Sequence, residues 1–204
     1  MRILAIDSAT PACSVALFDD AQLVAGEYVE LGRGHAERLV PMIAALPDRG
    51  RADRIVVARG PGSFTGVRIG IATARALALA WGADLRGYDT LDLVAAMARE
   101  QVGPLPVDVA MRGGHGEWFV AAYRADGTLS APLRSLTPEA AASQTRSENV
   151  AGSEAEALVA LRGLGRALPL LPDARAVPSL PEAALTSDVS PRYGRGPDAK
   201  LPTA

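Results

Sequence analysis

Two short stretches of the chain hold the side chains that could do chemistry, and the first is AIDSATPACSVAL at residues 5–17. Here Asp7 ends an apolar run, and Ser8 and Thr10 follow it in a tight turn. Such a turn can offer amides and hydroxyls to a phosphate while the acid holds a hydrated metal ion. It can equally be a polar hairpin in which Asp7 binds the backbone of its own turn. The residue types leave both interpretations open.

The second stretch is RGPGSFTGVRIG at residues 59–70, which places Gly60, Gly62 and Ser63 directly before a long helical pattern. Free amides at a helix N-terminus favour anions. No lysine follows Gly66, so the stretch does not match the phosphate-binding loop G-x-x-x-x-G-K-[ST]. It indicates a backbone that could accept an anion, without the lysine that would contact its phosphates.

The helix after this loop carries small residues at four-residue spacing, and we expect another backbone to approach it closely there. The stripe consists of Gly66, Gly70, Ala74 and Ala78, with Arg68 and Arg75 beside it. A glycine in a helix costs about 1 kcal/mol relative to alanine, which indicates that a close contact offsets the cost. The contact is either with the chain's own sheet or neighbouring helix, or with a second polypeptide.

Side chains for metal binding or nucleophilic catalysis are sparse. His35 and His115 lie far apart, neither has the spacing of a zinc motif, and Cys13 has no neighbouring base. We expect each histidine to be a lone exposed side chain near an arginine. Asp89 and Asp92 are three residues apart around a helix start, where acids favour the helix dipole, so we interpret them as capping residues. These side chains therefore offer no zinc motif and no nucleophile with a neighbouring base.

Composition limits the classes of protein to which the chain can belong. It has 204 residues, 49% of them hydrophobic and 22% charged, with a net charge of −2. These values predict a globular protein of one domain or two small ones, and they argue against an autonomous nucleic-acid binder. A single cysteine excludes an internal disulfide and favours the cytoplasm. We see no secretory signal and no run of about 18 apolar residues, so no membrane contact is expected.

The pattern of elements repeats once along the chain. The first half predicts strands at 2–7, 14–20 and 22–30, a helix at 35–46, a strand at 54–60, a helix at 65–81, a strand at 84–89 and a helix at 90–101. The second half predicts strands at 107–111, 117–125 and 129–136, a helix from 137, a strand at 148–153 and a helix at 153–165 that opens with a capping box of Ser153 and Glu156.

This duplicated βββαβα order predicts an α/β fold of two related subdomains facing each other across a cleft, the second one reduced. We divide the chain into residues 1–102, residues 103–190 and a tail at 191–204 that packs back on the first subdomain.

Two segments, MRILAIDSATPACSVALFDD and RGPGSFTGVRIGIATARALALA, together resemble the TsaB family, formerly YeaZ, of the bacterial machinery that makes threonylcarbamoyladenosine next to the anticodon of tRNA. The second segment is specific to that family, while the opening strand and turn are shared with the actin-like ATPase and sugar-kinase superfamily. The resemblance is strong over residues 1–102, weaker over 103–190, and returns at PRYGRGPDAKLP, residues 191–202. It implies the actin-like ATPase fold.

The resemblance also implies an architecture that has lost its reactive centre, with no catalytic residue, no metal and no cofactor. The catalytic relative, TsaD, carries an H-x-x-x-H metal site, and Thr90 and Val94 stand at the corresponding positions here. Arg112 replaces the acid that the family has at the cleft. The residues of the expected degenerate nucleotide or phosphate turn are Asp7, Ser8, Thr10, Gly60, Gly62 and Ser63.

As a family member, the chain would be a non-catalytic subunit that binds a TsaD-type threonylcarbamoyltransferase through helices of the first subdomain. It would form a homodimer when alone, work with a TsaE-type ATPase and reach tRNA through the complex. The residues expected at the partner or dimer interface are Leu39, Met42, Ile43, Gly66, Arg68, Gly70, Ala74, Arg75 and Ala78.

Three other functions remain open at this point. A kinase-like ATPase would use Asp7 and the glycine loop but needs a second carboxylate, and a metallopeptidase-like enzyme needs metal ligands. A regulatory homodimer that acts independently of TsaD would have the same sequence features.

Overall fold

The first subdomain is built on strands that are buried along much of their length. The computed structural model describes residues 1–194. The strands of the first sheet are β1 (Arg2–Asp7), β2 (Ala12–Asp19), β3 (Gln22–Glu30), β4 (Arg54–Ala58) and β5 (Asp84–Tyr88). They lie in the order β3-β2-β1-β4-β5, antiparallel on the β3 side of β1 and parallel on the β4 side. The near-continuous apolar run of β4 fits a strand covered on both faces.

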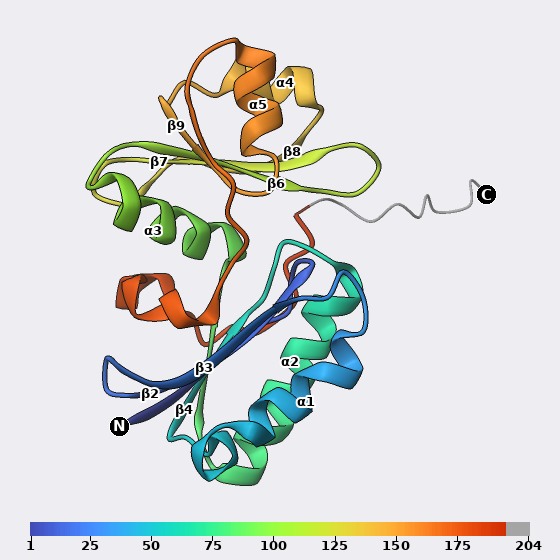
Figure 1. Ribbon diagram of the computed structural model, residues 1–204, viewed down its shortest axis with the longest axis vertical. Coiled ribbons are helices and arrows are strands. Elements are labelled where there is room, and N and C mark those ends of the chain that lie inside the picture. The colour runs from blue at the N-terminus through green and yellow to red at the C-terminus, as the bar shows by residue number, and fades with distance from the viewer. Residues whose placement is uncertain (195–204) are drawn as a thin grey trace, which may run out of the picture.

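Helices cover this sheet on both sides. One face carries α1 (His35–Ala45) and α2 (Phe64–Trp81), which lie side by side (Figure 1). A short 3₁₀ helix, η1 (Pro47–Gly50), follows α1. The other face is covered by α3 (Thr90–Val102) and by the 3₁₀ helix η2 (Ala174–Ser179), which returns from the end of the chain.

The second subdomain repeats the arrangement in shorter form. Its elements are β6 (Val107–Arg112), β7 (Trp118–Tyr123), β8 (Leu129–Leu136), α4 (Pro138–Gln144), β9 (Asn149–Ala151), α5 (Ala155–Arg162) and β10 (Arg166–Leu168). The strand order is β10-β9-β6-β7-β8, the counterpart of the first sheet. The expected duplication of βββαβα is confirmed. The strand β10 was not predicted, because three residues carry no periodic signal.

The helix α3 belongs to both hydrophobic cores. Leu93 and Ala96 pack into the cluster of the first sheet, whereas Leu91 and Val94 pack into the cluster of the second sheet. In Figure 1 the helix lies between the two sheets. It is the layer that joins the subdomains.

The chain returns to the first subdomain earlier than the division at residue 191 suggests. Ala174, Val177, Leu180 and Val189 all belong to the core of the first sheet. A third 3₁₀ helix, η3 (Glu182–Ala184), follows η2 in this returning segment. The last part of the expected tail, residues 195–204, lies outside the described residues.

The predicted capping box of α5 is not formed, so that prediction was wrong. The helix begins one residue later than expected, with Glu154 as N-cap and no side-chain cap hydrogen bond. Ser153 instead accepts a hydrogen bond from the backbone amide of Arg112 through Oγ, at 2.9 Å. Glu156 therefore falls at the second helical position, where the reciprocal bond of the box cannot form.

Candidate functional site

The carboxylate of Asp7 is enclosed by the chain itself. Asp7 ends β1 and is fully buried. Its Oδ1 accepts a hydrogen bond from the amide of Ala9 at 2.9 Å, and its Oδ2 accepts one from the hydroxyl of Tyr88 at 2.8 Å. The bond to Ala9 is the one expected of a polar hairpin. Both carboxylate oxygens are therefore engaged, and the partner Tyr88, far away in sequence, was not foreseen.

Burial also changes the acidity of this group. Desolvation raises the pKa of Asp7 to about 6, although the hydrogen bonds from Ala9 and Tyr88 act in the opposite direction. The same enclosure raises the pKa of Tyr88 above its ordinary value, because burial and the neighbouring Asp7 both disfavour a phenolate. The pair is a buried hydrogen bond between a tyrosine hydroxyl and a carboxylate.

The two predicted motifs do come together, backbone against backbone. Ser8 donates through Oγ to the carbonyl of Gly66 at 2.9 Å, and the amide of Ser63 donates to the carbonyl of Ala9 at 2.7 Å. The side chain of Ser63 caps α2 by accepting from the amide of Gly66 at 3.2 Å. These amides would otherwise be available to an anion, and here the turn and the cap use them.

Three glycines make this approach possible. A Cβ on Gly62 would lie 1.9 Å from the carbonyl oxygen of Ala9, and a Cβ on Gly66 would lie 2.1 Å from that of Ser8. A Cβ on Gly70 would lie 2.5 Å from Oγ of Ser8. The space beside the turn is thus filled by the first turns of α2.

The small-residue stripe of α2 faces the chain's own sheet, the first of the two alternatives. Its four residues are buried, and Gly70 lies over Ile6 and Val57. The residues expected from α1 are buried in the same core. Seven of the nine residues expected at the interface are buried inside the chain, so their side chains are not open to a partner in this structure: Leu39, Met42, Ile43, Gly66, Gly70, Ala74 and Ala78.

The outer face of α1 and α2 carries a different set of apolar side chains. Val40 is 55% exposed, Phe64 55% and Leu79 87%. Exposed alanines at four-residue spacing lie between them, namely Ala36, Ala44, Ala72, Ala76 and Ala80. We call Val40, Phe64, Leu79 and these alanines the outer helix face. The sequence does contain this second stripe, but small residues on both sides of α2 conceal which side is buried.

Arg68 and Arg75 are exposed, as expected, and both contact the C-terminal segment. Arg68 donates through Nε to the hydroxyl of Tyr193 at 2.8 Å, and its guanidinium lies 3.8 Å from the ring centre of Phe64. Arg75 donates to the carbonyl of Val189 at 3.3 Å.

A cleft of about 540 Å³ lies between the subdomains, next to the β1–β2 turn. Its lining includes Tyr28 and Arg175 from the first subdomain side and Arg112 from β6. Arg112 donates through Nε to Glu154 at 2.8 Å, and Arg175 donates to Asp173 at 2.6 Å. Each arginine of the cleft is therefore paired with a carboxylate of the chain.

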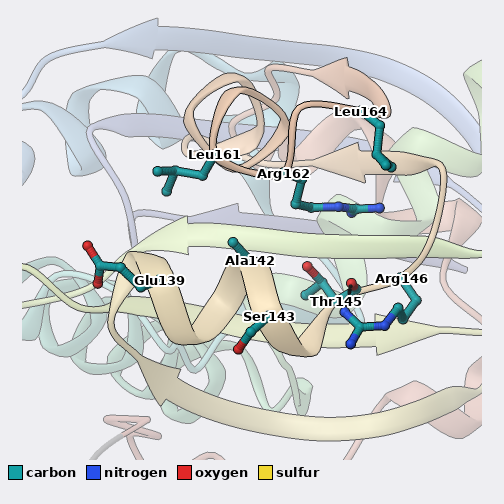
Figure 2. Close-up of a pocket in the computed structure, with 8 residues that line it drawn as sticks. All are labelled: Glu139, Ala142, Ser143, Thr145, Arg146, Leu161, Arg162 and Leu164. Atoms are coloured by element: carbon teal, nitrogen blue, oxygen red, sulfur yellow. Dashed lines mark hydrogen bonds between the residues drawn. The ribbon is translucent and has the colours of Figure 1, made fainter.

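A second hollow, of about 710 Å³, lies on the outer side of the second subdomain between α4 and α5 (Figure 2). Leu161, Leu164 and Arg146 line it, together with the mostly buried Arg162, which lies 3.5 Å from Asp108. None of the predicted site residues lies in it.

The histidines and the cysteine have structural surroundings. His35 is buried, contrary to expectation, and its Nε2 lies 2.8 Å from the carbonyl oxygen of Thr10. A carbonyl only accepts, so Nε2 donates and fastens the start of α1 to the turn. Burial raises the pKa of Cys13 to about 11, which disfavours a reactive thiolate. His115 lies in the β6–β7 turn.

The two positions expected from the resemblance to correspond to metal ligands are fully buried at the start of α3. They hold Thr90 and Val94. Within residues 1–194, no group of three or more His, Cys, Asp or Glu side chains is placed to hold a metal ion. In the same part of the chain, no helix combines the length and apolar character needed to cross a membrane.

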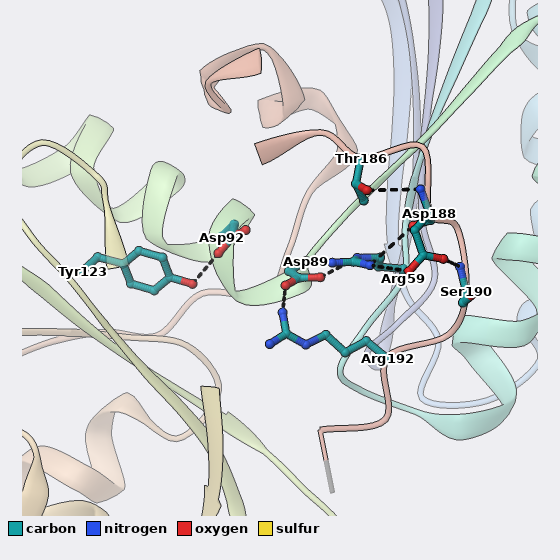
Figure 3. A network of polar contacts seen from close by, with 8 residues as sticks. All are labelled: Arg59, Asp89, Asp92, Tyr123, Thr186, Asp188, Ser190 and Arg192. Atoms are coloured by element: carbon teal, nitrogen blue, oxygen red, sulfur yellow. Dashed lines mark hydrogen bonds and ion pairs between the residues drawn. The ribbon is translucent and has the colours of Figure 1, made fainter. Parts of the chain in front are cut away.

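Asp89 and Asp92 do not act as side-chain caps, so our interpretation of them was wrong. Asp89 occupies the N-cap position of α3 but makes no cap hydrogen bond. It binds Arg59 and Arg192 instead, while Asp92 accepts a hydrogen bond from Tyr123 at 2.7 Å (Figure 3). Ion pairing and burial outweigh the helix dipole at these two acids.

Comparison with known proteins places these features in a family. The family model for TsaD, tRNA N6-adenosine threonylcarbamoyltransferase, matches residues 29–161. The chain is 42% identical over 132 residues to the tRNA threonylcarbamoyladenosine biosynthesis protein TsaB of Escherichia coli (strain K12), covering 62% of this chain and 56% of that protein. It is 35% identical over 119 residues to the protein of the same name from Bacillus subtilis (strain 168), covering 55% and 52%. The chain thus spans little more than half the length of these curated relatives.

Solved structures agree with this result. YeaZ from Pseudomonas aeruginosa superposes with a TM-score of 0.80 at 28% identity, covering 94% of this chain and 99% of that one. The ethanolamine utilization protein EutJ from Carboxydothermus hydrogenoformans has a TM-score of 0.53 at 13% identity, covering 89% and 90%, and shows the fold alone. The fold is the expected actin-like ATPase fold.

The buried carboxylate gives a prediction for the pH dependence of stability. The pKa of Asp7 is higher in the folded chain than in the unfolded one, so its protonated form is favoured by folding. Its contribution is fully present below about pH 4 and is lost as the pH rises through 6. Relative to Asp7→Asn, the free energy of unfolding of the parent should therefore fall by about 2 kcal/mol between pH 4 and 7. Urea unfolding of both proteins across this range measures the difference, and a constant difference would contradict the buried site.

The close contact at Gly66 gives a prediction for stability, because helix propensity and the steric clash change the free energy of unfolding in opposite directions. Helix propensity alone makes Gly66→Ala stabilising by about 1 kcal/mol. The clash of the new Cβ with the carbonyl of Ser8 should outweigh this gain, so we expect a net loss of about 1–3 kcal/mol. Chemical denaturation measures it, with the exposed Ala76→Ser as the control in the same helix. A stabilised Gly66→Ala would show that the turn and α2 are not in tight contact.

Proposed function

The chain belongs to the TsaB/YeaZ family within the reach of the TsaD family model, and we propose that it is a partner subunit of a TsaD-type threonylcarbamoyltransferase that does no chemistry itself. In this role it supports the formation of N6-threonylcarbamoyladenosine in tRNA, at the adenosine next to the anticodon. The tRNA is reached through the complex, to which a TsaE-type ATPase also belongs. The lone buried Cys13 and the modest net charge support a cytoplasmic location.

The observation that carries the proposal is that the chain itself occupies the polar groups of the β1–β2 turn and the space beside them. Asp7 has both oxygens engaged by Ala9 and Tyr88, and α2 fills the space beside the turn. A metal-bound nucleotide would need that carboxylate and that space. This closure supports a subunit that has kept the fold of an ATPase without its activity.

Two enzymatic alternatives lack support from the site. A kinase-like ATPase needs a second acid that is open to the cleft, and the end of β6 holds Arg112, paired with Glu154. The two acids that do line the cleft, Asp173 and Glu30, are bound by Arg175 and Tyr28. A metallopeptidase needs a cluster of ligands, and the described residues place none together. Calorimetric titration with Mg-ATP tests the first alternative, and turnover by the isolated chain would favour it.

We assign the contact with the TsaD-type partner to the outer helix face. A leucine that is 87% exposed, beside alanines at four-residue spacing, suits the close approach of another helix. The same face would serve a second copy of the chain when the partner is absent. This assignment uses exposed residues of α1 and α2 in place of the buried residues of the same two helices that the sequence suggested.

This assignment predicts that Leu79→Glu weakens the mixed complex by about tenfold or more, because a charge would be buried in an apolar contact. The melting temperature of the chain at a dilution where copies do not associate should not change, since Leu79 is 87% exposed in the single chain. The matched control is Leu164→Glu, a leucine that is 61% exposed on the second subdomain. Size-exclusion chromatography with light scattering and a binding titration against the TsaD-type protein of the same genome measure both.

The outcomes separate the surface from the function. Normal binding by Leu79→Glu together with weak binding by Leu164→Glu would move the docking surface to the second subdomain. A parent chain that forms no mixed complex, with or without nucleotide, would contradict the proposed function itself.

A further inference from the structure

The last described residues form a strap along the first subdomain. The amide of Gly87 donates to the carbonyl of Thr186 at 2.8 Å, and the amide of Thr186 donates back at 2.9 Å, so the strap starts as a bridge to β5. Farther along, Val189 is buried in the core. The amide of Arg192 donates to the carbonyl of Arg59 at 2.7 Å. We call residues 186–194 the latch.

The latch meets the start of α3 in a cluster of charged side chains (Figure 3). Asp89 accepts a hydrogen bond from Nε of Arg59 at 2.7 Å and is also bound by Nη1 of Arg192. Asp188, within the latch, lies 3.5 Å from Arg59. Because the side chain of Asp89 is only 12% exposed, these pairs are screened less than surface pairs. Two arginines and two aspartates balance in charge.

Asp89 lies where the subdomains would bend relative to each other. It connects β5, in the first sheet, to α3, which is fixed to the second sheet by Leu91, by Val94 and by the hydrogen bond between Tyr123 and Asp92. Although α3 also packs on the first sheet, a rotation of the second sheet that carries α3 with it would bend the chain at Asp89, between β5 and α3. The side chain of Asp89 is bound by Arg192 of the latch.

The end of the latch also lies between the subdomains. Arg192 lines a small cavity together with Tyr123 and Leu133 of the second sheet. A Cβ on Gly194 would lie 2.6 Å from the ring of Phe119 in β7 and 2.9 Å from Cβ of Pro61 in the glycine loop. Only a glycine fits between these two side chains, at a positive φ of 72°.

We propose that the latch fixes the angle between the two subdomains, by holding Asp89 at the bending point through Arg192 and by filling the contact between Pro61 and Phe119 with Gly194. Two covalent connections join the two sheets: β5 to β6 through α3, and β10 to η2. The latch supplies a non-covalent third connection, which can be released.

One consequence rests on the proposed function. The ring of Tyr193 stacks on Phe64 of the outer helix face at 5.0 Å between centroids. A partner that displaces Tyr193 would pull on both neighbours in the chain, Arg192 and Gly194, and so alter the angle of the cleft. The angle itself can be tested without any partner.

The experiment is single-molecule energy transfer on the isolated full chain, at a dilution where copies do not associate. The native Cys13 is buried, so dyes can be attached to cysteines introduced at two exposed positions, Arg51→Cys and Glu156→Cys. These positions lie in the first and second subdomains. Arg192→Gln and Gly194→Val each weaken the latch between the subdomains. Arg75→Gln is the matched control, because it removes a latch contact that lies within the first subdomain.

We expect one narrow transfer efficiency for the parent and for Arg75→Gln, and a broadened or shifted one for both Arg192→Gln and Gly194→Val. Circular dichroism checks that each variant is folded, and Arg192→Gln is the milder change because that side chain is partly exposed. The proposal is overturned if both latch variants keep the parent distribution. It is equally overturned if Arg75→Gln broadens the distribution as much as they do, since the latch would then act on general stability alone.

Discussion

The backbone of the β1–β2 turn and the first turns of α2 lie so close together that no side chain fits between them. This contact requires glycine at positions 62 and 66, where a Cβ would overlap a carbonyl oxygen of the turn. It has two consequences for the chain. It places α2 firmly on the sheet, and it uses the amides and the space with which a glycine loop could bind a phosphate. A motif that resembles an anion site is thus a packing motif in this chain.

Asp7, the acid in that turn, also has a structural role, because the chain itself hydrogen-bonds to both of its carboxylate oxygens. To bind a metal ion, the carboxylate of Asp7 would have to be open to that ion or to its water ligands. Instead Tyr88 and Ala9 hydrogen-bond to its two oxygens, and burial raises its pKa to about 6. A hydrogen bond to a buried neutral hydroxyl is a weak replacement for a cation. The site therefore carries a cost in stability at neutral pH, which the surrounding apolar core must offset.

The sequence predicts the order of strands and helices well, because residues within each element and at its ends mark it. The strands are short apolar runs between turn residues, and α2 begins after a serine that can cap it. Relations between distant residues were not predictable. Tyr88 and Asp7, which share a hydrogen bond, lie 81 residues apart in the sequence. The capping box at Ser153 does not form, and its neighbour Glu154 binds Arg112 of β6. The sequence predicts a tail that packs back on the first subdomain, but the Pro-rich end of the chain has no period from which the contact of Arg192 with Asp89 could be foreseen.

The two faces of α2 explain why its role was the hardest to predict. Glycine and alanine have almost no side chain, so neither face of the helix is distinguished by hydrophobicity, and burial is decided by which stripe fits the backbone beneath it. Gly66 and Gly70 allow the closer approach, and they turn toward the sheet. The alanines and Leu79 are then left outside, on a surface that costs little to desolvate and that another helix can approach closely. The packing that closes the turn on one side of α2 thereby leaves the apolar face exposed on the other, so one contact accounts for both features of the helix.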